Sequence, residues 1–257
     1  MFEKAVKGLR NPDKVAPYII DKLNRKRSER WCSRHAISLD DYATQRSADL
    51  WEETQQYSNE LERQFHRQYD GLNTSTFTED AHVGGGAAFD MLYFITRMIE
   101  PETVVETGVA AGWSTRAVLD ALHENDFGRL YSNDLPYSDR PDKQDIPHIE
   151  RGEIGILVDE DVRDRWELSL GPDRDNLPNI VQSVDSIDLF HYDSDKSYDG
   201  REFGMNQVKP KLHENSVVVM DDIEDNLFFR DFVIDRDVEY RVIKSGRSKS
   251  VGIIKGI

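Results

Sequence analysis

The most informative stretch of this sequence is VVETGVAAGWST, residues 104–115. An apolar strand end runs into the acidic Glu106, a Gly-x-x-x-Gly turn follows at Gly108 and Gly112, and a helix starts at Ser114. Glycines let the backbone pass close to a bound ligand. A carboxylate in such a loop suits a ligand with a cationic part, whereas it would repel a phosphate. The stretch therefore predicts a strand, a ligand-binding turn and a helix.

Three other interpretations of this stretch make different demands on its residues. A plain strand–turn–helix joint of an α/β domain needs no ligand and stays open. A dinucleotide fingerprint requires Gly-x-Gly-x-x-Gly, but this chain has Ala110 within the turn and the spacing does not match. A phosphate-binding P-loop requires Gly-Lys-Ser/Thr, but Gly112 is followed by Trp113. Both nucleotide-phosphate patterns are therefore disfavoured.

Further along the chain, apolar segments end in acidic residues at Asp134, at Asp193 and at the pair Asp221 and Asp222. In open α/β sheets, ligands bind at the carboxyl ends of the strands, so these side chains are expected to lie close together. Asp134 lies 26 positions after Gly108. A carboxylate at the end of the second strand accepts hydrogen bonds from ribose hydroxyls, and this is the role that we predict for Asp134. A solvated loop aspartate is the alternative.

Together these residues resemble a class I S-adenosylmethionine (SAM)-dependent methyltransferase, over roughly residues 80–255. The likeness is to the branch that contains catechol, caffeoyl-CoA, sugar and macrolide O-methyltransferases. Residues 106–114 are similar to the first motif of that family, with Ala110 in place of its middle glycine. The segment Asp193-Ser-Asp-Lys196 resembles the Asp-x-x-Lys of the metal-dependent members. The pair Asp221 and Asp222 stands where those members carry Asp-Asn or Asp-Asp.

The resemblance implies a Rossmann-like α/β fold with a seven-stranded sheet, and SAM as the cofactor. The residues that it places around SAM are Glu106, Gly108, Gly112, Ser114, Asp134, Asp173, Arg174 and Asp193. Asp173 is equally compatible with a helix cap. The glycines at 84–86 are expected to reach the methionine end of SAM, and a flexible hinge is the alternative there.

The resemblance also implies metal-assisted transfer of a methyl group to a hydroxyl. Mg²⁺ (or Mn²⁺) prefers oxygen ligands, which Asp193, Asp221 and Asp222 would supply, and the metal would lower the pKa of the substrate hydroxyl. Lys196 would take the proton, so Asp193 and Lys196 are the catalytic candidates. A set of solvated acidic residues is the alternative for this cluster. His191 lies within the strand and is interpreted as a packed core residue.

The composition limits the classes of protein to which this chain can belong. A chain of 257 residues predicts one main domain with an elaboration. Its net charge of −16 resembles that of proteins from salt-loving archaea and argues against nucleic-acid binding, because a polyanion would be repelled. The one cysteine, Cys32, allows no disulfide within the chain, and the sequence has neither an apolar run of about 20 residues nor a signal-peptide core. A cytoplasmic location is therefore expected.

The first 80 residues are predicted to form a helical region ahead of a methyltransferase domain at 81–257. Residues 1–35 hold ten basic and four acidic residues, and their apolar residues recur at helical spacing, which predicts two short basic amphipathic helices. These helices either cap the acidic domain or dock it on a membrane surface. A long helix is predicted at 38–70, with an apolar stripe for the core or for a contact between subunits.

Residues 135–160 contain several prolines and aspartates and are predicted to form a loop that shapes the substrate pocket. Taken together, the chain is expected to be a SAM-dependent O-methyltransferase that acts, with a divalent metal, on a hydroxyl of a sugar, a lipid-linked glycan or a similar small molecule. It would be cytoplasmic or peripheral at the inner membrane face, and the long helix leaves room for a homo-oligomer. A NAD-dependent oxidoreductase and a SAM-binding protein without catalysis are the alternatives.

Overall fold

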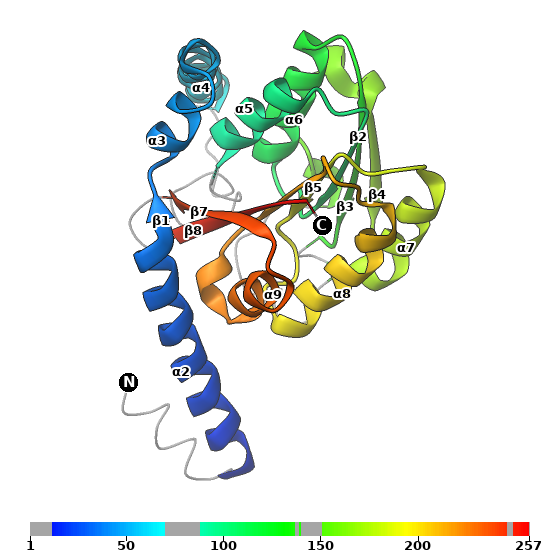
Figure 1. Ribbon diagram of the computed structural model, residues 1–257. Coiled ribbons are helices and arrows are strands. Elements are labelled where there is room, and N and C mark those ends of the chain that lie inside the picture. Colours follow the sequence, from blue (N-terminus) through cyan, green and yellow to red (C-terminus); the bar gives the residue numbers. More distant parts are fainter. Residues whose placement is uncertain (1–11, 70–87, 137–138, 140–150, 246–248, 257) are drawn as a thin grey trace.

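The computed structural model describes residues 12–69, 88–136, 139, 151–245 and 249–256, and its centre is one eight-stranded sheet (Figure 1). The strands, in chain order, are β1 (Ala36–Ile37), β2 (Thr103–Thr107), β3 (Arg129–Asp134), β4 (Trp166–Leu170), β5 (Leu189–Tyr192), β6 (Val217–Met220), β7 (Glu239–Ser245) and β8 (Lys249–Lys255). Across the sheet their order is β1-β7-β8-β6-β5-β2-β3-β4. The strand β8 runs antiparallel to its neighbours β6 and β7, and the remaining pairs are parallel.

The chain builds this sheet outward from two central strands. From β2 it continues to β3 and β4 on one side, and it then returns to β5 and β6 on the other. The strand order therefore reverses between β2 and β5, and ligands of open α/β sheets bind at such a switch point, outside the carboxyl ends of the strands. All residues of β5 and β6 are buried, as expected for parallel strands that are covered on both faces. The predicted Rossmann-like α/β fold is confirmed.

Helices cover both faces of the sheet (Figure 1). They are α2 (Pro12–His35), α3 (Leu39–Thr44), α4 (Ala48–Tyr69), α5 (Phe89–Ile99), α6 (Trp113–Glu124), α7 (Asp173–Ser183), α8 (Tyr198–Val208) and α9 (Phe228–Arg236). One apolar core lies between the sheet and the helices α3, α4, α5 and α6. A second core lies between the sheet and the helices α2, α7, α8 and α9. The switch point of the sheet lies between these two cores.

The N-terminal region differs from the prediction in three ways. Of the two short helices predicted within 1–35, the first lies outside the described residues, and the second is part of a longer helix, α2, which contains Pro17 and continues to His35. Pro17 is the sixth residue of this helix, beyond the first turn, and the helix continues through it although proline has no amide to donate. In place of one helix at 38–70 there are two, α3 and α4, with Ser38 as the cap of α3. Between α2 and α3 lies β1, which pairs with β7 and makes eight strands in place of the predicted seven.

The apolar stripe of the predicted long helix packs inside this chain. Trp51 and Leu61 of α4 are buried, and the ring of Tyr57 stacks on Tyr93 of α5 at 3.9 Å between ring centroids. The stripe is therefore part of the core. The domain boundary predicted at residue 80 and the glycines at 84–86 lie outside the described residues, so both stay predictions.

The segment predicted as a loop at 135–160 is partly ordered against the glycine turn. Its described part contains the short helical turn η2 (Arg151–Glu153) and leads into η3 (Glu160–Arg165). Between them, Gly155 N donates to Ala110 O at 2.8 Å and Leu157 N donates to Ala111 O at 3.0 Å. Backbone hydrogen bonds therefore tie this segment to the ligand-binding turn. Residues 140–150 lie outside the described residues.

None of the described helices is both long enough and apolar enough to cross a bilayer.

Candidate cofactor and catalytic site

The glycine turn follows β2 at the switch point of the sheet. Gly108 and Gly112 have positive φ angles of 86° and 96°, and Ala110 between them has a φ of 49°. A Cβ atom added at Gly108 would lie 2.5 Å from the carbonyl oxygen of Asp193, so the backbones of the two loops touch there. Ala110 adopts the left-handed conformation at a cost of about 1–2 kcal/mol, which explains how alanine can replace the middle glycine of the motif.

Glu106 is fully buried at the end of β2 and receives hydrogen bonds from several elements. Its carboxylate accepts from the hydroxyls of Ser114 at 2.7 Å, Thr115 at 2.7 Å and Ser132 at 2.8 Å, and it lies 3.2 Å from Nδ1 of His191. Burial by itself raises the pKa of the Glu106 carboxyl, but the His191 ring and the hydroxyl donors outweigh burial and lower the pKa below its usual value. These contacts tie β2 to β3, β5 and α6.

In this network, Ser114 and His191 both contact Glu106. His191 is buried within β5, as the core interpretation states. Glu106 and Ser114 bond to each other, so these contacts hold the strand and the start of α6 around the turn. An effect of Glu106 on a bound cofactor would therefore pass through the shape of the turn.

Asp134, at the end of β3, lies against the same turn. Its Oδ2 accepts hydrogen bonds from the backbone amides of Val109 at 2.7 Å and Ala110 at 3.0 Å. Sequence reasoning placed Asp134 at the ribose, and the structure brings it to the glycine turn as that role requires. Asp134 is 7% exposed, and the ribose contact stays a prediction.

The two predicted residues of the adenine turn lie differently. Asp173 Oδ1 accepts from Asn133 Nδ2 at 2.7 Å, and Asp173 Oδ2 accepts from Ser194 Oγ at 2.5 Å. The residue at the cap position of α7 is Pro172, so Asp173 bridges two strand ends and is not the helix cap. The guanidinium of Arg174 lies over the ring of Phe203 on α8, 4.8 Å from its centroid. Asp173 therefore takes part in the contacts between strand ends, whereas Arg174 packs on the helix α8.

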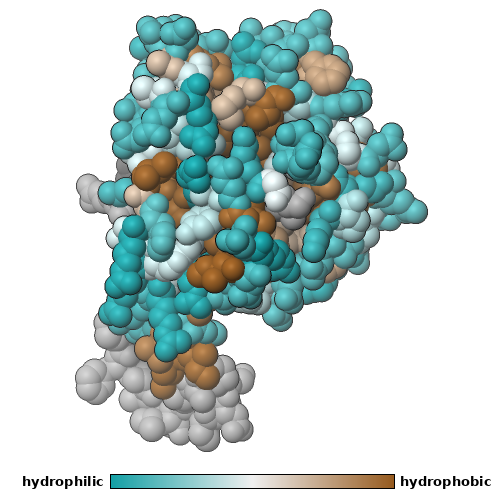
Figure 2. All heavy atoms as spheres, viewed as in Figure 1, coloured by the Kyte–Doolittle hydropathy of each residue, from teal (hydrophilic) through white to brown (hydrophobic). Residues whose placement is uncertain are grey.

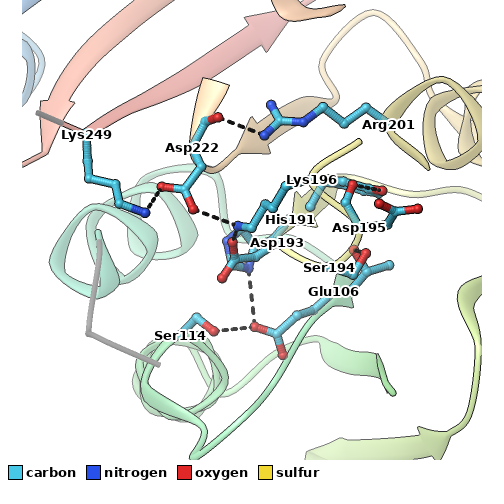
Figure 3. A network of polar contacts seen from close by, with 12 residues as sticks. Glu106, Ser114, His191, Asp193, Ser194, Asp195, Lys196, Arg201, Asp222 and Lys249 are labelled. Carbon is cyan, nitrogen blue, oxygen red and sulfur yellow. Dashed lines mark hydrogen bonds and ion pairs between the residues drawn. The ribbon is translucent and has the colours of Figure 1, made fainter. Parts of the chain in front are cut away.

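The catalytic candidates converge at the ends of β5 and β6 (Figure 3). Lys196 Nζ contacts the carboxylate of Asp193 and lies 3.1 Å from Asp222 Oδ2. The other oxygen of Asp222 lies 2.5 Å from Nζ of Lys249, at the start of β8. Asp221 is 4% exposed and its charge acts on Lys196. The structure thus brings Asp193, Asp222 and Lys196 into contact, with Lys249 as an additional cation, and the roles predicted for these residues stay predictions.

Burial and charge move the pKa values in this cluster in different directions. Burial lowers the pKa of Lys196, although the charges of Asp221 and Asp222 oppose it. Burial raises the pKa of Asp221 in spite of the nearby Lys196. Burial would also raise the pKa of Asp222, but Lys196 and Lys249 outweigh it and lower the pKa. Burial therefore favours the neutral amine of Lys196, and the two lysines favour the ionised carboxylate of Asp222.

As arranged in the structure, the aspartates do not fit a divalent metal. Lys196 stands between Asp193 and Asp222, and Lys249 holds the second Asp222 oxygen, so two ammonium groups take the positions that a metal would need. Across the described part of the chain, no group of three or more His, Cys, Asp and Glu residues is arranged to hold a metal ion. A metal would bind only after both lysines had withdrawn.

Sequence reasoning missed four residues that take part in these contacts, namely Asn133, Ser194, Arg201 and Lys249. Asn133 and Ser194 each stand next to a predicted residue, and their position at a strand end is a signal that could have found them. Lys249 begins the last strand, and Arg201 lies inside a helix. For these two no local pattern exists, because the order of the strands brings Lys249 to Asp222 and the docking of α8 brings Arg201 there.

Comparison with known proteins agrees with this geometry. Residues 105–223 match a family model described as a methyltransferase domain. No curated protein matches the chain.

Solved structures supply the fold comparison. The O-methyltransferase TomG from Streptomyces achromogenes, in complex with SAM, is 18% identical with a TM-score of 0.53, covering 77% of this chain and 89% of its own. An O-methyltransferase from Bacillus cereus in complex with SAH is 13% identical with a TM-score of 0.51, covering 87% and 99%. A putative caffeoyl-CoA O-methyltransferase from Staphylococcus aureus is 11% identical with a TM-score of 0.52, covering 77% and 91%. With the strand order and the glycine turn, these likenesses show that the chain has a methyltransferase-like fold.

Proposed function

We propose that this protein is a SAM-dependent O-methyltransferase in which Lys196 is the general base. The observation that carries the proposal is the contact between the glycine turn and the loop at 193–196, where a Cβ at Gly108 would meet the backbone of Asp193. The turn lies within the residues that match a methyltransferase domain, and the loop holds a lysine whose pKa is lowered by burial. The SAM-bound TomG and the SAH-bound Bacillus cereus enzyme, which share the fold, support the choice of cofactor.

The proposed reaction moves one methyl group from the sulfonium of SAM to a substrate oxygen. Neutral Lys196 Nζ accepts the hydroxyl proton, the oxygen forms a bond to the methyl carbon, and the bond between sulfur and that carbon breaks with its electron pair on sulfur. The products are a methyl ether, SAH and a protonated Lys196. Asp193 and Asp222 contact Nζ and would stabilise the ammonium that forms. Holding the reactants in line supplies much of the rate.

The acceptor that we propose is a hydroxyl of a sugar or glycan, free or linked to a lipid. This choice rests on the resemblance to sugar-modifying O-methyltransferases. The test supplies SAM with three acceptor panels, of monosaccharides, lipid-linked glycans and catechols, and measures SAH release. Turnover confined to the catechols would overturn the glycan assignment and leave the reaction type standing.

The cofactor site is tested by replacing Asp134 with alanine. Loss of a hydrogen bond to a charged group costs about 1.5–3 kcal/mol, so we expect SAM affinity to fall by roughly 10- to 150-fold in calorimetric titration. Asp134→Asn should lose less, because its amide oxygen can still accept from the amides of Val109 and Ala110. Asp164→Ala, at an exposed position, is the control. An unchanged affinity in folded Asp134→Ala protein would remove Asp134 from the cofactor site.

Assistance by Mg²⁺ or Mn²⁺ stays a prediction from the sequence. Because Lys196 and Lys249 already contact the Asp222 carboxylate, we expect turnover to be retained when protein is freed of metal with a chelator. The measurement compares SAH release before chelation, after chelation, and after addition of excess Mg²⁺ or Mn²⁺. Loss of activity that only the metal restores would show that the lysines withdraw and the aspartates bind a cation.

We also propose that helix α2, away from the catalytic site, makes peripheral contact with a membrane. The helix α2 projects from the domain, and Figure 2 shows an apolar group on its projecting part. Four of its side chains are between 49% and 62% exposed, namely Tyr18, Ile19, Ile20 and Leu23. The basic residues Lys22, Lys26, Arg27 and Arg30 stand exposed on the same helix. In an otherwise acidic protein, this combination suits an anionic lipid surface, where each basic residue contributes about 1 kcal/mol.

The membrane proposal is tested by flotation with anionic and with neutral phospholipid vesicles. We expect Leu23→Glu and Ile20→Glu to reduce binding to anionic vesicles several-fold, because each change removes apolar surface and adds negative charge. Ile234→Glu on α9, where the side chain is 56% exposed, is the matched control. In molar salt, screening at about 3 Å should leave mainly the apolar contribution. Equal flotation of all variants would make α2 a structural cap only.

A further inference from the structure

Asp222 has a backbone conformation that the rest of the structure must hold in place. It follows β6 with φ 50° and ψ 40°, in the left-handed region, and begins the short turn η5 (Ile223–Asp225). A residue other than glycine adopts this conformation at a cost of about 1–3 kcal/mol, and it persists only where neighbouring contacts compensate. The conformation also sets the direction in which the Asp222 carboxylate points toward Lys196. A residue that holds this backbone therefore acts on the catalytic cluster.

Arg201 of α8 supplies such a contact. Its side chain is fully buried, and Nη2 donates to the carbonyl oxygen of Asp222 at 2.8 Å. Within the described structure, Arg201 Nε and Nη1 have no hydrogen-bond partner. A buried guanidinium that is only partly hydrogen-bonded costs free energy, because it has lost its hydration without full replacement. Stability alone is therefore a poor reason for arginine at this position.

The position of Arg201 in the chain connects the two halves of the site. The helix α8 starts at Tyr198, directly after the loop that carries Asp193 and Lys196, and the Ser197 hydroxyl caps it by accepting from Gly200 N at 2.9 Å. From the first turns of this helix, Arg201 reaches the loop after β6, where its guanidinium meets the Asp222 carbonyl (Figure 3). A second hydrogen bond, from Asn226 Nδ2 to the Lys196 carbonyl at 2.7 Å, joins the same loops.

We propose that Arg201 is a positioning residue, which sets the Asp222 carboxylate against Lys196 by fixing the left-handed backbone of Asp222. It touches neither substrate nor cofactor in this role and acts through Asp222. The effect on catalysis rests on the proposed function. The effect on the Asp222 backbone rests only on the hydrogen bond from Arg201. The alternative is a purely structural role, in which loss of Arg201 lowers only the stability of the fold.

The two alternatives differ in what methionine does at this position. Apolar residues of similar volume often replace a buried charge without loss of stability. For a positioning residue, Arg201→Met should keep the thermal midpoint within a few degrees and the KM for SAM within about twofold, while kcat falls at least tenfold. Arg201→Lys should recover kcat only in part, because its shorter side chain has to bring a single donor to the Asp222 carbonyl that Arg201 reaches with Nη2. Val208→Ala, a buried change on the same helix, should lower the midpoint without a comparable fall in kcat.

The experiment measures kcat, the KM for SAM and thermal unfolding for the wild type and these three variants, and adds amide hydrogen exchange of the peptide over 221–226. The exchange of that peptide should quicken in Arg201→Met and stay unchanged in Val208→Ala. Absence of methyl transfer in the wild type would overturn the proposed function, and the exchange measurement would still decide whether Arg201 holds the turn. Unaltered kcat and exchange in Arg201→Met, or losses that only follow stability as in Val208→Ala, would overturn the positioning role.

Discussion

Replacing Lys196 by methionine is expected to slow methyl transfer by roughly 10²- to 10⁴-fold, the usual contribution of a general acid or base. Methionine keeps much of the length of the side chain and removes the nitrogen that contacts Asp193 and Asp222. SAM binding should change little, because the glycine turn and Asp134 stay intact. The measurement is kcat from SAH release, with SAM affinity from calorimetry. Lys209→Met, at an exposed position, is the control.

A second substitution separates the proton-accepting role of Lys196 from its charge. Lys196→Arg keeps a cation near the two aspartates but cannot release a proton in the working range of pH. It should therefore be as slow as Lys196→Met. A nearly active Lys196→Arg enzyme would mean that Lys196 serves as a positive charge only, and another group would have to accept the proton.

The pH dependence of the wild type follows from the same residue. Burial lowers the pKa of Lys196 from its ordinary value of 10.5, and only the neutral amine can accept a proton. Turnover should therefore rise with pH and level off once pH exceeds this lowered pKa. Lys196→Met should lack that rise, as a pH profile of kcat would show.

Replacing Gly108 by alanine is expected to lower SAM affinity at least tenfold and to lower the thermal midpoint by several degrees. The positive φ of 86° costs an L-residue about 1–2 kcal/mol, and 1 kcal/mol shifts the midpoint by about 2–4 °C in a chain of this size. The new Cβ would also lie 2.5 Å from the carbonyl oxygen of Asp193, which forces two backbones apart. That displacement moves the catalytic loop away from the cofactor turn.

The matched control is Gly152→Ala, because a Cβ at Gly152 would meet nothing within 4 Å. This variant should keep both the midpoint and the affinity of the wild type. Calorimetry with SAM and a thermal scan measure the two effects. Wild-type values for Gly108→Ala would show that the turn and the loop at 193–196 do not touch in solution.

Several features of this protein were open to prediction because their signals are local. The strand, turn and helix at 104–115 follow from apolar residues, two glycines and a helix start that are adjacent in the chain. The convergence of Asp134, Asp193 and Asp222 follows from one rule, that parallel strands bring their carboxyl ends to one edge of the sheet. Ser38 as a helix cap followed from its residue type, although the helix that it begins ends at Thr44.

Other features depended on packing between distant segments. The break between α3 and α4 opposes the sequence pattern, because contacts with the core outweigh local preference. The network around Glu106 needs three strands and a helix to come together. Neither the apolar periodicity nor the glycine spacing contains that information.

The sequence by itself thus determined the class of fold and the edge of the sheet that carries the site, since both follow from strand ends and a turn motif. Only the tertiary structure decided which cations stand beside the acids. Lys249 reaches Asp222 across 27 positions, and Ser28 of α2 bonds the Ile223 carbonyl across 195. Such pairs arise because β8 inserts between β6 and β7 and because α2 packs against η5. The order of strands and the docking of helices set these contacts, and no local repeat in the chain encodes them.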